Sequence, residues 1–160
     1  MKIRRAERRD VEAIRDIYNQ AVLTTTATYD YEPQTLEQQL AWFEEHTVFV
    51  AQDETGRVVG WSSVGPYRAR PGYQFTVEDS IYVAEDCRGR GLGKLLLPPA
   101  IDAARQMGKR AMVAVIDAES EVSLRLHKRF GFEEVGRLPQ VGFKFGRWLD
   151  VVLLELLLSS

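Results

Sequence analysis

The order of apolar patterns along the chain constrains its fold most strongly. Residues with helical spacing and β-branched runs are mixed without regular alternation, which is typical of α+β domains. Helical patterns cover residues 11–22, 35–43, a stretch that ends near 107, and 120–130; strand patterns cover 3–5, 48–51, 58–64, 75–83, 111–116, 132–135 and 148–157. We therefore predict a single α+β domain over residues 1–160.

The charge and the apolar runs limit the partners and the location of such a domain. The net charge is −2, whereas nucleic acid and anionic membranes need a basic face, so neither is expected as a partner. Cys87 is the only cysteine, which excludes an internal disulfide and fits a reducing compartment. The longest apolar run, residues 151–158, contains Glu155 and is too short to span a bilayer. With no apolar leader at the start, we expect a cytoplasmic protein.

A glycine-rich stretch, EDCRGRGLGKLLLPP, covers residues 85–99. It is not a P-loop, since Leu95 stands where Ser or Thr would bind magnesium, and it lacks the G-x-G-x-x-G dinucleotide pattern. It does contain Arg88-x-x-Gly91-x-Gly93, between a predicted strand and a predicted helix. Glycines let backbone amides approach an oxyanion, and the helix adds free N–H groups and a positive dipole end. The stretch predicts a diphosphate site; the alternative is a turn without a ligand.

This R-x-x-G-x-G pattern resembles the signature of the GCN5-related N-acetyltransferase superfamily. Within it, the chain most resembles the phosphinothricin and methionine-sulfoximine acetyltransferases. The resemblance rests on IYNQAV (17–22), TVEDSIYV (76–83), RGRGLGK (88–94), LHKRFGF (126–132) and GFKFGRWLD (142–150). It implies a mixed, mostly antiparallel, twisted sheet of about seven strands flanked by about four helices. It also implies a homodimer.

The resemblance implies acetyl-CoA as the co-substrate. The strand that holds the SIYV segment would splay from its neighbour and pair through its main chain with the pantetheine arm. The amides of the glycine stretch would hold the diphosphate, with added charge from Arg90 and Lys94. Ser120 stands where related enzymes usually carry an asparagine, so it would replace only part of a pantetheine contact. The implied cofactor-binding residues are Ile81, Tyr82, Val83, Arg88, Gly89, Arg90, Gly91, Leu92, Gly93, Lys94 and Ser120.

Glu78 and His127 are the catalytic residues that the resemblance implies. An amine must lose a proton before it attacks a thioester, and a carboxylate such as Glu78 can accept that proton. The alternative for Glu78 is a rim residue paired with an arginine. His127 stands where most of the superfamily carries a tyrosine near the departing sulfur, and an imidazole can act as acid or base near neutral pH. The alternative for His127 is a packed helix residue that a carbonyl satisfies.

The loop PYRARPGY, residues 66–73, contains the main candidates for binding the acceptor. The guanidinium groups of Arg68 and Arg70 would hold a carboxylate or phosphinate of the acceptor. Asp79 and Ser80 are further candidates, because they lie beside Glu78 in the sequence. Glu78 itself would contact the acceptor amine.

Two other regions carry expectations. Related enzymes use aromatic residues of the loop between the first two helices to bind the acceptor, which makes Tyr29 and Tyr31 candidates; ordinary packing is the alternative. Pro98 and Pro99 fall within the helix after the glycine stretch, where each removes an N–H group, so we expect a kink or an early irregular turn.

The sequence therefore predicts an N-acetyltransferase that moves an acetyl group to the amine of a small amino acid or analogue. Phosphinothricin, methionine sulfoximine or methionine sulfone are the acceptors that the resemblance implies, with direct attack in a ternary complex. One alternative acceptor is another small amine or a protein N-terminus. Another alternative is a sensor that binds acyl-CoA without turnover. No cysteine–histidine cluster has metal-ligand spacing, so no metal is expected.

Overall fold

The computed structural model describes residues 1–158, which contain seven strands and four α-helices. The strands are β1 Lys2–Arg5, β2 Thr47–Gln52, β3 Val58–Pro66, β4 Thr76–Val83, β5 Ala111–Asp117, β6 Glu133–Lys144 and β7 Arg147–Leu157. The helices are α1 Val11–Thr24, α2 Leu36–Glu44, α3 Leu92–Gln106 and α4 Glu121–Arg129. The predicted α+β class is confirmed. The predicted domain, residues 1–160, includes two residues outside the described part.

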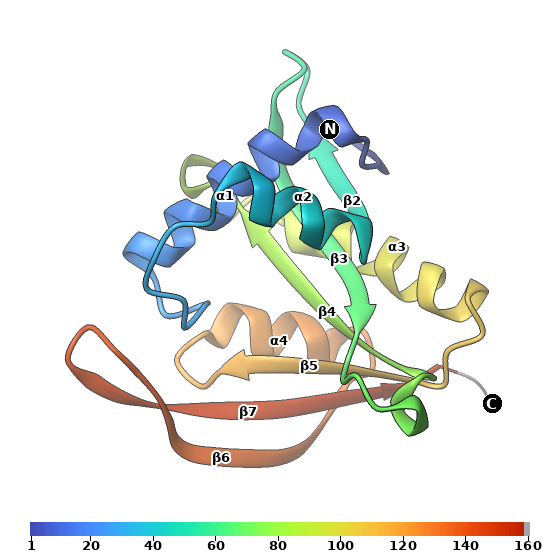
Figure 1. The fold of residues 1–160 in the computed structure, drawn as a ribbon, viewed down its shortest axis with the longest axis vertical. Coiled ribbons are helices and arrows are strands. Elements are labelled where there is room, and N and C mark those ends of the chain that lie inside the picture. Colours follow the sequence, from blue (N-terminus) through green and yellow to red (C-terminus); the bar gives the residue numbers. More distant parts are fainter. Residues whose placement is uncertain (159–160) are drawn as a thin grey trace.

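The strands form one mixed sheet in the order β1-β2-β3-β4-β5-β7-β6. Only β4 and β5 are parallel; every other neighbouring pair is antiparallel. Helices α1 and α2 cover one face of the sheet, and α3 and α4 cover the other (Figure 1). This arrangement confirms the sheet and helices that the family resemblance implied.

The sheet separates into two halves between β4 and β5. These strands pair at only three positions, from Thr76 opposite Ala111 to Glu78 opposite Val113. Beyond Glu78, β4 continues to pair with β3, and β5 with β7, while the two central strands diverge (Figure 1). We call this divergence the splay; it confirms the splay expected for the strand that holds SIYV.

Two hydrophobic cores support the two halves. One core includes Ile14 of α1, Trp61 of β3 and Leu96 of α3. The other includes Leu97 of α3 and buried residues of β5 and β7. The second core also includes Val64 of β3 and Val77 of β4, so it joins the two halves where β4 and β5 pair.

The starts of α1 and α2 are capped differently. Thr35 accepts a hydrogen bond from the Gln38 amide at 3.1 Å, and the Gln38 side chain accepts one from the Thr35 amide at 2.9 Å, a complete capping box. Asp10, which directly precedes α1, makes no side-chain cap bond to that helix. Its carboxylate instead accepts two hydrogen bonds from Arg4, at 2.8 and 2.9 Å, and is buried.

Helix α3 continues through Pro98 and Pro99, so the irregular turn named as one of the two expectations is absent. The prolines lack N–H groups, which deprives the carbonyls of Lys94 and Leu95 of their helical donors. Burial of the apolar face of α3 in both cores outweighs this local cost. The buried Ser62 hydroxyl also ties the helix to β3, since it donates to the Leu96 carbonyl at 2.8 Å.

Strand β6 is much longer than the predicted strand at 132–135. Gly136, Pro139 and Gly142 obscure its pattern, yet it pairs with β7 from Glu133 to Lys144. Proline is tolerated because β6 lies at the sheet edge. The pairing is irregular between Leu138 and Gly142, so tertiary pairing rather than local propensity defines this strand.

The burial of α3 in the first core gives a stability prediction. Leu96 is fully buried, whereas its neighbour Leu95 is 46% exposed. Leu96→Ala should lower the free energy of unfolding by about 3 kcal/mol, because it leaves a cavity. The control Leu95→Ala should cost about 0.5 kcal/mol or less. Equal effects of the two variants in urea unfolding would contradict this description of α3.

Candidate active site

Glu78 lies at the point where the sheet splays. It is the last β4 residue paired with β5, and its cross-strand partner in β3 is Gly65. Its side chain shares a face of β4 with Ser80 and Tyr82, because strand residues alternate between faces. Trp61, opposite Tyr82, packs on Trp42 of α2, so this is the face that α1 and α2 cover.

The environment of Glu78 changes its acidity. Burial raises the pKa of its carboxyl, and the charge of Asp79 raises it further, while the charge of Arg68 opposes both. A carboxylate with a raised pKa is a better proton acceptor than an exposed one. Arg68 is therefore close enough to influence Glu78 electrostatically.

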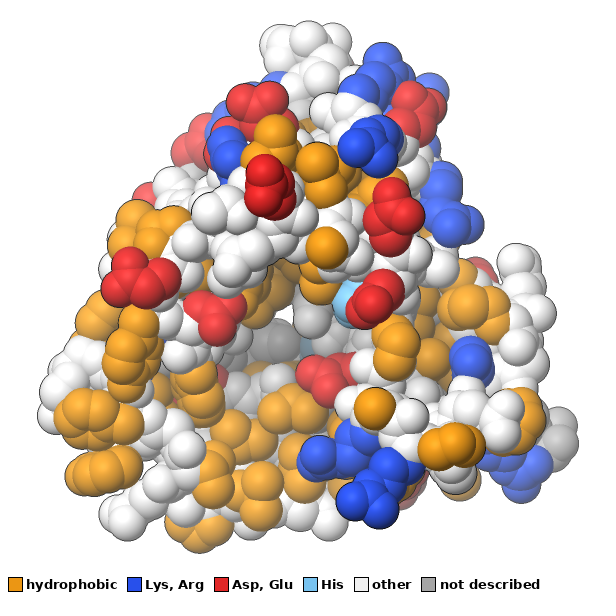
Figure 2. Space-filling model, in the orientation of Figure 1, with side chains coloured by type: hydrophobic (Ala, Val, Ile, Leu, Met, Phe, Trp, Pro, Cys, Tyr) orange, Lys and Arg blue, Asp and Glu red, His pale blue; other side chains and the backbone are white. Residues whose placement is uncertain are grey.

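A cavity of about 210 Å³ lies on the same face of the sheet. Four aromatic side chains line it, from Tyr18, Trp42, Trp61 and Tyr82, together with the polar side chains of Asp30, Gln34, Gln39 and Ser80. The indole N–H of Trp61 is buried and has no acceptor among the described residues. We call this space the α1–α2 cavity. In the space-filling view, this side of the molecule is hollowed at its centre (Figure 2).

Asp79 faces the opposite side of β4 and is paired with His127 of α4. The side chains are 1% and 4% exposed, and Nε2 of His127 lies 2.8 Å from Oδ2 of Asp79. The structure therefore moves Asp79 away from the acceptor side, where the sequence had suggested it, because adjacent strand residues point to opposite faces. The other carboxylate oxygen, Oδ1, is buried with no partner among the described residues.

Both nitrogens of His127 are engaged. Nδ1 lies 2.8 Å from the carbonyl of Ser123, which can only accept, so Nδ1 carries a proton. Nε2 faces the Asp79 carboxylate, which favours a second proton there. Burial lowers the pKa of His127, but the hydrogen bond and charge of Asp79 outweigh it, so the pKa is raised above 6.5. The geometry is that of a buried imidazolium–carboxylate pair.

The register of β4 leaves main-chain groups free along the splay. The Ala84 amide donates to the Val59 carbonyl at 2.8 Å, so these two opposite residues form a hydrogen-bonded pair. Such pairs occur at every second position of an antiparallel ladder, so Tyr82 and Trp61 form the next one. The amides and carbonyls of the alternate residues Ile81 and Val83 therefore point to the splay, where the Val83 carbonyl accepts a hydrogen bond from Nε of Arg88 at 3.4 Å. The amide and carbonyl of Tyr82 point to β3 instead, which differs from the predicted main-chain contact between Tyr82 and the cofactor.

The glycine-rich turn has the geometry of an anion site. Gly89 and Gly91 have φ values of +79° and +76°, which favour glycine, and Gly91 immediately precedes α3. No described residue accepts a hydrogen bond from the amides of Gly89, Arg90 or Gly91. Gly93 also allows α3 to pack closely on α4, since a Cβ at this position would lie 2.7 Å from Cδ2 of Leu126.

The remaining predicted residues lie apart from one another. Arg68 is near Glu78, whereas no contact joins Arg70 to the site among residues 1–158. Tyr29 donates to Asp117 at 2.6 Å, and Tyr31 donates to the Phe143 carbonyl, so neither hydroxyl is free. Neither tyrosine lines the α1–α2 cavity. Their role as acceptor contacts stays a prediction; Tyr31 is 59% exposed and lines a separate pocket with Phe143, Lys144 and Phe145.

The aromatic lining of the α1–α2 cavity was missed in the sequence. Trp61 falls within the predicted strand 58–64, Tyr18 within the predicted helix 11–22, and Tyr82 was predicted only as a main-chain contact of the cofactor. The pairing of Trp61 with Tyr82 depends on the register of β3 and β4, which no local pattern indicates. Within residues 1–158, no group of three or more His, Cys, Asp or Glu is placed to hold a metal, and no helix is long and apolar enough to cross a membrane.

Comparison with known proteins agrees with this geometry. The sequence model of the acetyltransferase (GNAT) family matches residues 11–132. The chain belongs to this family. It is 43% identical to the L-amino acid N-acyltransferase MnaT of Escherichia coli K12, over 100% of this chain and 95% of that protein. It is 44% identical to an L-methionine sulfoximine/L-methionine sulfone acetyltransferase of Pseudomonas paraeruginosa, over 96% of this chain and 92% of the relative.

Solved structures of the family share the fold. A phosphinothricin acetyltransferase from Sinorhizobium meliloti, solved in complex with acetyl-CoA, superimposes with a TM-score of 0.94 at 37% identity. The match covers 99% of this chain and 88% of that one. The family assignment made from the motifs is thus confirmed.

The buried pair predicts opposite behaviour of the two histidines. His127 should titrate above 6.5, and His46, whose pKa burial lowers, should titrate below it. In Asp79→Asn the pKa of His127 should fall below 6.5, because burial then dominates. Nuclear magnetic resonance titration of the imidazoles measures both values, with His46 as the internal control.

The same pair sets a pH dependence of stability. A raised pKa in the folded state adds stability that is complete below 6.5 and is lost as the pH rises through the folded value. The free energy of unfolding of the native protein should therefore exceed that of Asp79→Asn, and this difference should be larger at pH 6 than at pH 9, at about 25 °C. A constant difference across this range would show that His127 is not charged in the fold.

Proposed function

We propose that this protein transfers an acetyl group from acetyl-CoA to the amine of a small amino acid or analogue. One observation carries the proposal. At the splay, β4 carries the Glu78 carboxyl, whose pKa is raised, on the same face as Ser80 and Tyr82 of the cavity wall, and it directs main-chain groups toward the gap beside β5. One strand can thus bring an amine and an acyl donor together.

The free groups of the chain fit acetyl-CoA. The amides of Ile81 and Val83 and the carbonyl of Ile81 suit the amides of a pantetheine arm, whereas the Val83 carbonyl already accepts from Arg88. The unbonded amides of the turn from Gly89 to Gly91, at the positive end of α3, suit the diphosphate. Arg90 and Lys94 add exposed positive charge. The bound molecule supplies the acetyl group as an activated thioester; Arg88, Leu92, Gly93 and Ser120 complete the proposed contacts.

Each charged residue of the site has a separate role. Glu78 takes the proton of the acceptor amine, which makes the nitrogen lone pair available for direct attack. Arg68 holds the acceptor carboxylate near Glu78. His127, charged through Asp79, places a positive charge on the other face of β4, where it favours the negative charge that develops on the departing sulfur. Its side chain remains buried throughout.

The α1–α2 cavity is the proposed place for the acceptor side chain. Its lining includes the carboxylate of Asp30 and no lysine or arginine. The Trp61 indole N–H and the Gln39 amide are donors to a sulfone or sulfoximine oxygen. An anionic phosphinate would meet the charge of Asp30 instead. The lining therefore favours a neutral polar side chain.

The role of Glu78 is tested by Glu78→Gln. This variant should lower kcat about 10²-fold or more, because the amide cannot accept the proton, while the affinity for acetyl-CoA stays within about twofold. The matched control, Glu12→Gln on the exposed surface of α1, should retain native kcat. A thiol-release assay and calorimetry of acetyl-CoA binding measure these values.

Three results would contradict parts of the proposal. Native kcat in Glu78→Gln would remove Glu78 as the base. A trapped acetyl-enzyme would exclude direct transfer. Tight binding of acetyl-CoA without acetylation of any amine in a broad panel would indicate a sensor.

The cavity lining predicts the order of acceptors. The kcat/KM for L-methionine sulfoximine or sulfone should exceed that for phosphinothricin by about tenfold or more. Asp30→Asn should narrow this difference, because it removes the carboxylate that opposes a phosphinate. Equal values for the two acceptors in the native enzyme would place the acceptor side chain elsewhere.

We also propose a cytoplasmic homodimer. Six apolar side chains of the β6–β7 hairpin are 42–65% exposed: Val135, Leu138, Val141, Phe143, Phe145 and Trp148. Apolar side chains gather over this hairpin in the lower part of the space-filling view (Figure 2). An exposed apolar edge of this kind supports association with a second copy. Sedimentation at several concentrations tests the assembly.

A further inference from the structure

The loop between α1 and α2, residues 25–35, bridges the two strands of the splay. On one side, the Tyr82 hydroxyl of β4 donates to the Ala27 carbonyl at 3.3 Å. On the other side, Thr26 and Tyr29 donate to the two carboxylate oxygens of Asp117, at 2.8 and 2.6 Å. Asp117 is the last residue of β5 and is buried. The loop thus crosses the open end of the splay (Figure 1).

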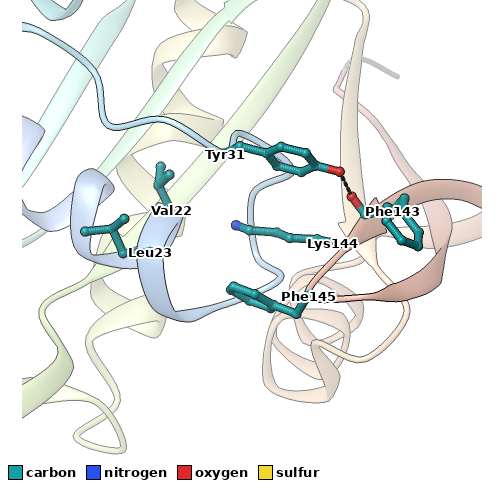
Figure 3. Close-up of a pocket in the computed structure, with 6 residues that line it drawn as sticks. All are labelled: Val22, Leu23, Tyr31, Phe143, Lys144 and Phe145. Carbon is teal, nitrogen blue, oxygen red and sulfur yellow. Dashed lines mark hydrogen bonds between the residues drawn. The ribbon is translucent and has the colours of Figure 1, made fainter.

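The tip of the β6–β7 hairpin holds this loop from outside the α1–α2 cavity. Lys144 extends between Tyr31 and Phe145 toward the end of α1, and the Tyr31 hydroxyl meets the Phe143 carbonyl (Figure 3). Nζ of Lys144 donates to the Thr28 carbonyl at 2.8 Å. Lys144 is only 3% exposed, and burial lowers its pKa. A buried amine is costly unless it is bonded, so this contact fixes Thr28.

A chain of hydrogen bonds connects Lys144 to the cavity wall. The carbonyl of Thr28 accepts a hydrogen bond from Lys144. The hydroxyl of Thr28 forms a hydrogen bond with the Tyr18 hydroxyl, with 2.8 Å between the two oxygens. The Tyr18 hydroxyl also donates to the Asp30 carboxylate. Tyr18 and Asp30 both line the α1–α2 cavity, whereas Lys144 does not. The hairpin therefore acts on the cavity only through the loop.

Gly142 provides a second, independent contact. A Cβ at this position would lie 2.4 Å from Cε2 of Tyr29, so only glycine lets the ring lie against β6. With its ring on Gly142, Tyr29 reaches Asp117. Two residues before Gly142, Gln140 has a φ of +57°, and its backbone amide donates to the Asp150 carboxylate at 2.9 Å. This irregular turn of β6 bends the strand toward the loop.

We propose that Gly142 and Lys144 are positioning residues that set the affinity for the acceptor by holding the α1–α2 loop across the splay. The inference rests on the proposed function, because the loop supplies Asp30 to the acceptor cavity. It gives a physical role to the GFKFGRWLD segment: the hairpin shapes an acceptor site that its side chains do not touch.

The test is steady-state kinetics with acetyl-CoA and L-methionine sulfoximine. Gly142→Ala and Lys144→Met should each raise the KM for the acceptor about tenfold, while the KM for acetyl-CoA stays within about twofold. The controls are Gly136→Ala, on the same strand with a nearest contact of 3.6 Å, and Lys2→Met, an exposed lysine; both should match the native enzyme. Melting temperatures show which variants fold.

A double-variant cycle separates positioning from general loosening. Tyr29→Leu removes the ring that a Cβ at position 142 would strike, so Gly142→Ala should add little in that background. Hydrogen exchange of residues 26–31 should rise in Gly142→Ala and stay native in Gly136→Ala, a readout that does not depend on turnover.

The outcomes distinguish this inference from the proposed function. A native protein that acetylates no amine would overturn the proposed function, and the acceptor part of the inference with it. An active native enzyme whose folded Gly142→Ala and Lys144→Met variants keep the native acceptor KM would overturn the inference alone. A parallel rise in the KM of both substrates would also overturn it, because that result indicates loss of structure at the whole site.

Discussion

The short pairing between β4 and β5 is the constraint on which the rest of this structure depends. Three paired positions join the halves of the sheet, and Glu78 lies at the third. Because β4 then loses its neighbour, the amides of Ile81 and Val83 and the Ile81 carbonyl have no partner strand on this side. The second core spans the junction, since it includes Val64 of β3 and Val77 of β4 as well as residues of β5 and β7.

The alternation of side chains along β4 divides the chemistry between two faces. Glu78 lies on the face that α1 and α2 cover, and Asp79 faces α4, where its hydrogen bond and charge raise the pKa of His127. A buried ion pair is costly to form but more costly to break, because removal of one partner leaves an isolated charge. Asp79 thus makes His127 hold its proton up to a higher pH than burial alone would allow.

The far end of the chain completes the site that the first half begins. The α1–α2 loop contributes the wall of the cavity, but its position depends on Asp117 of β5 and on the hairpin tip at Gly142 and Lys144. Hydrogen bonds from Lys144 to Thr28, from Tyr31 to Phe143 and from Tyr29 to Asp150 each join residues more than a hundred positions apart in the sequence. These contacts are the basis of the proposed link between the hairpin and the acceptor site.

The sequence by itself determined the fold class, most helices and strands, the glycine turn before α3 and the position of Glu78. These features depend on local periodicity, on the φ values that glycine permits and on motif spacing, all of which are readable from neighbouring residues. Tertiary structure decided the rest. Pro98 and Pro99 lie in an unbroken helix because burial outweighs local cost, and β6 extends to Lys144 because β7 pairs with it. The separation of Asp79 from the acceptor face, the engagement of Tyr29 and Tyr31, and the aromatic cavity also required the fold, because each depends on contacts between segments distant in the chain.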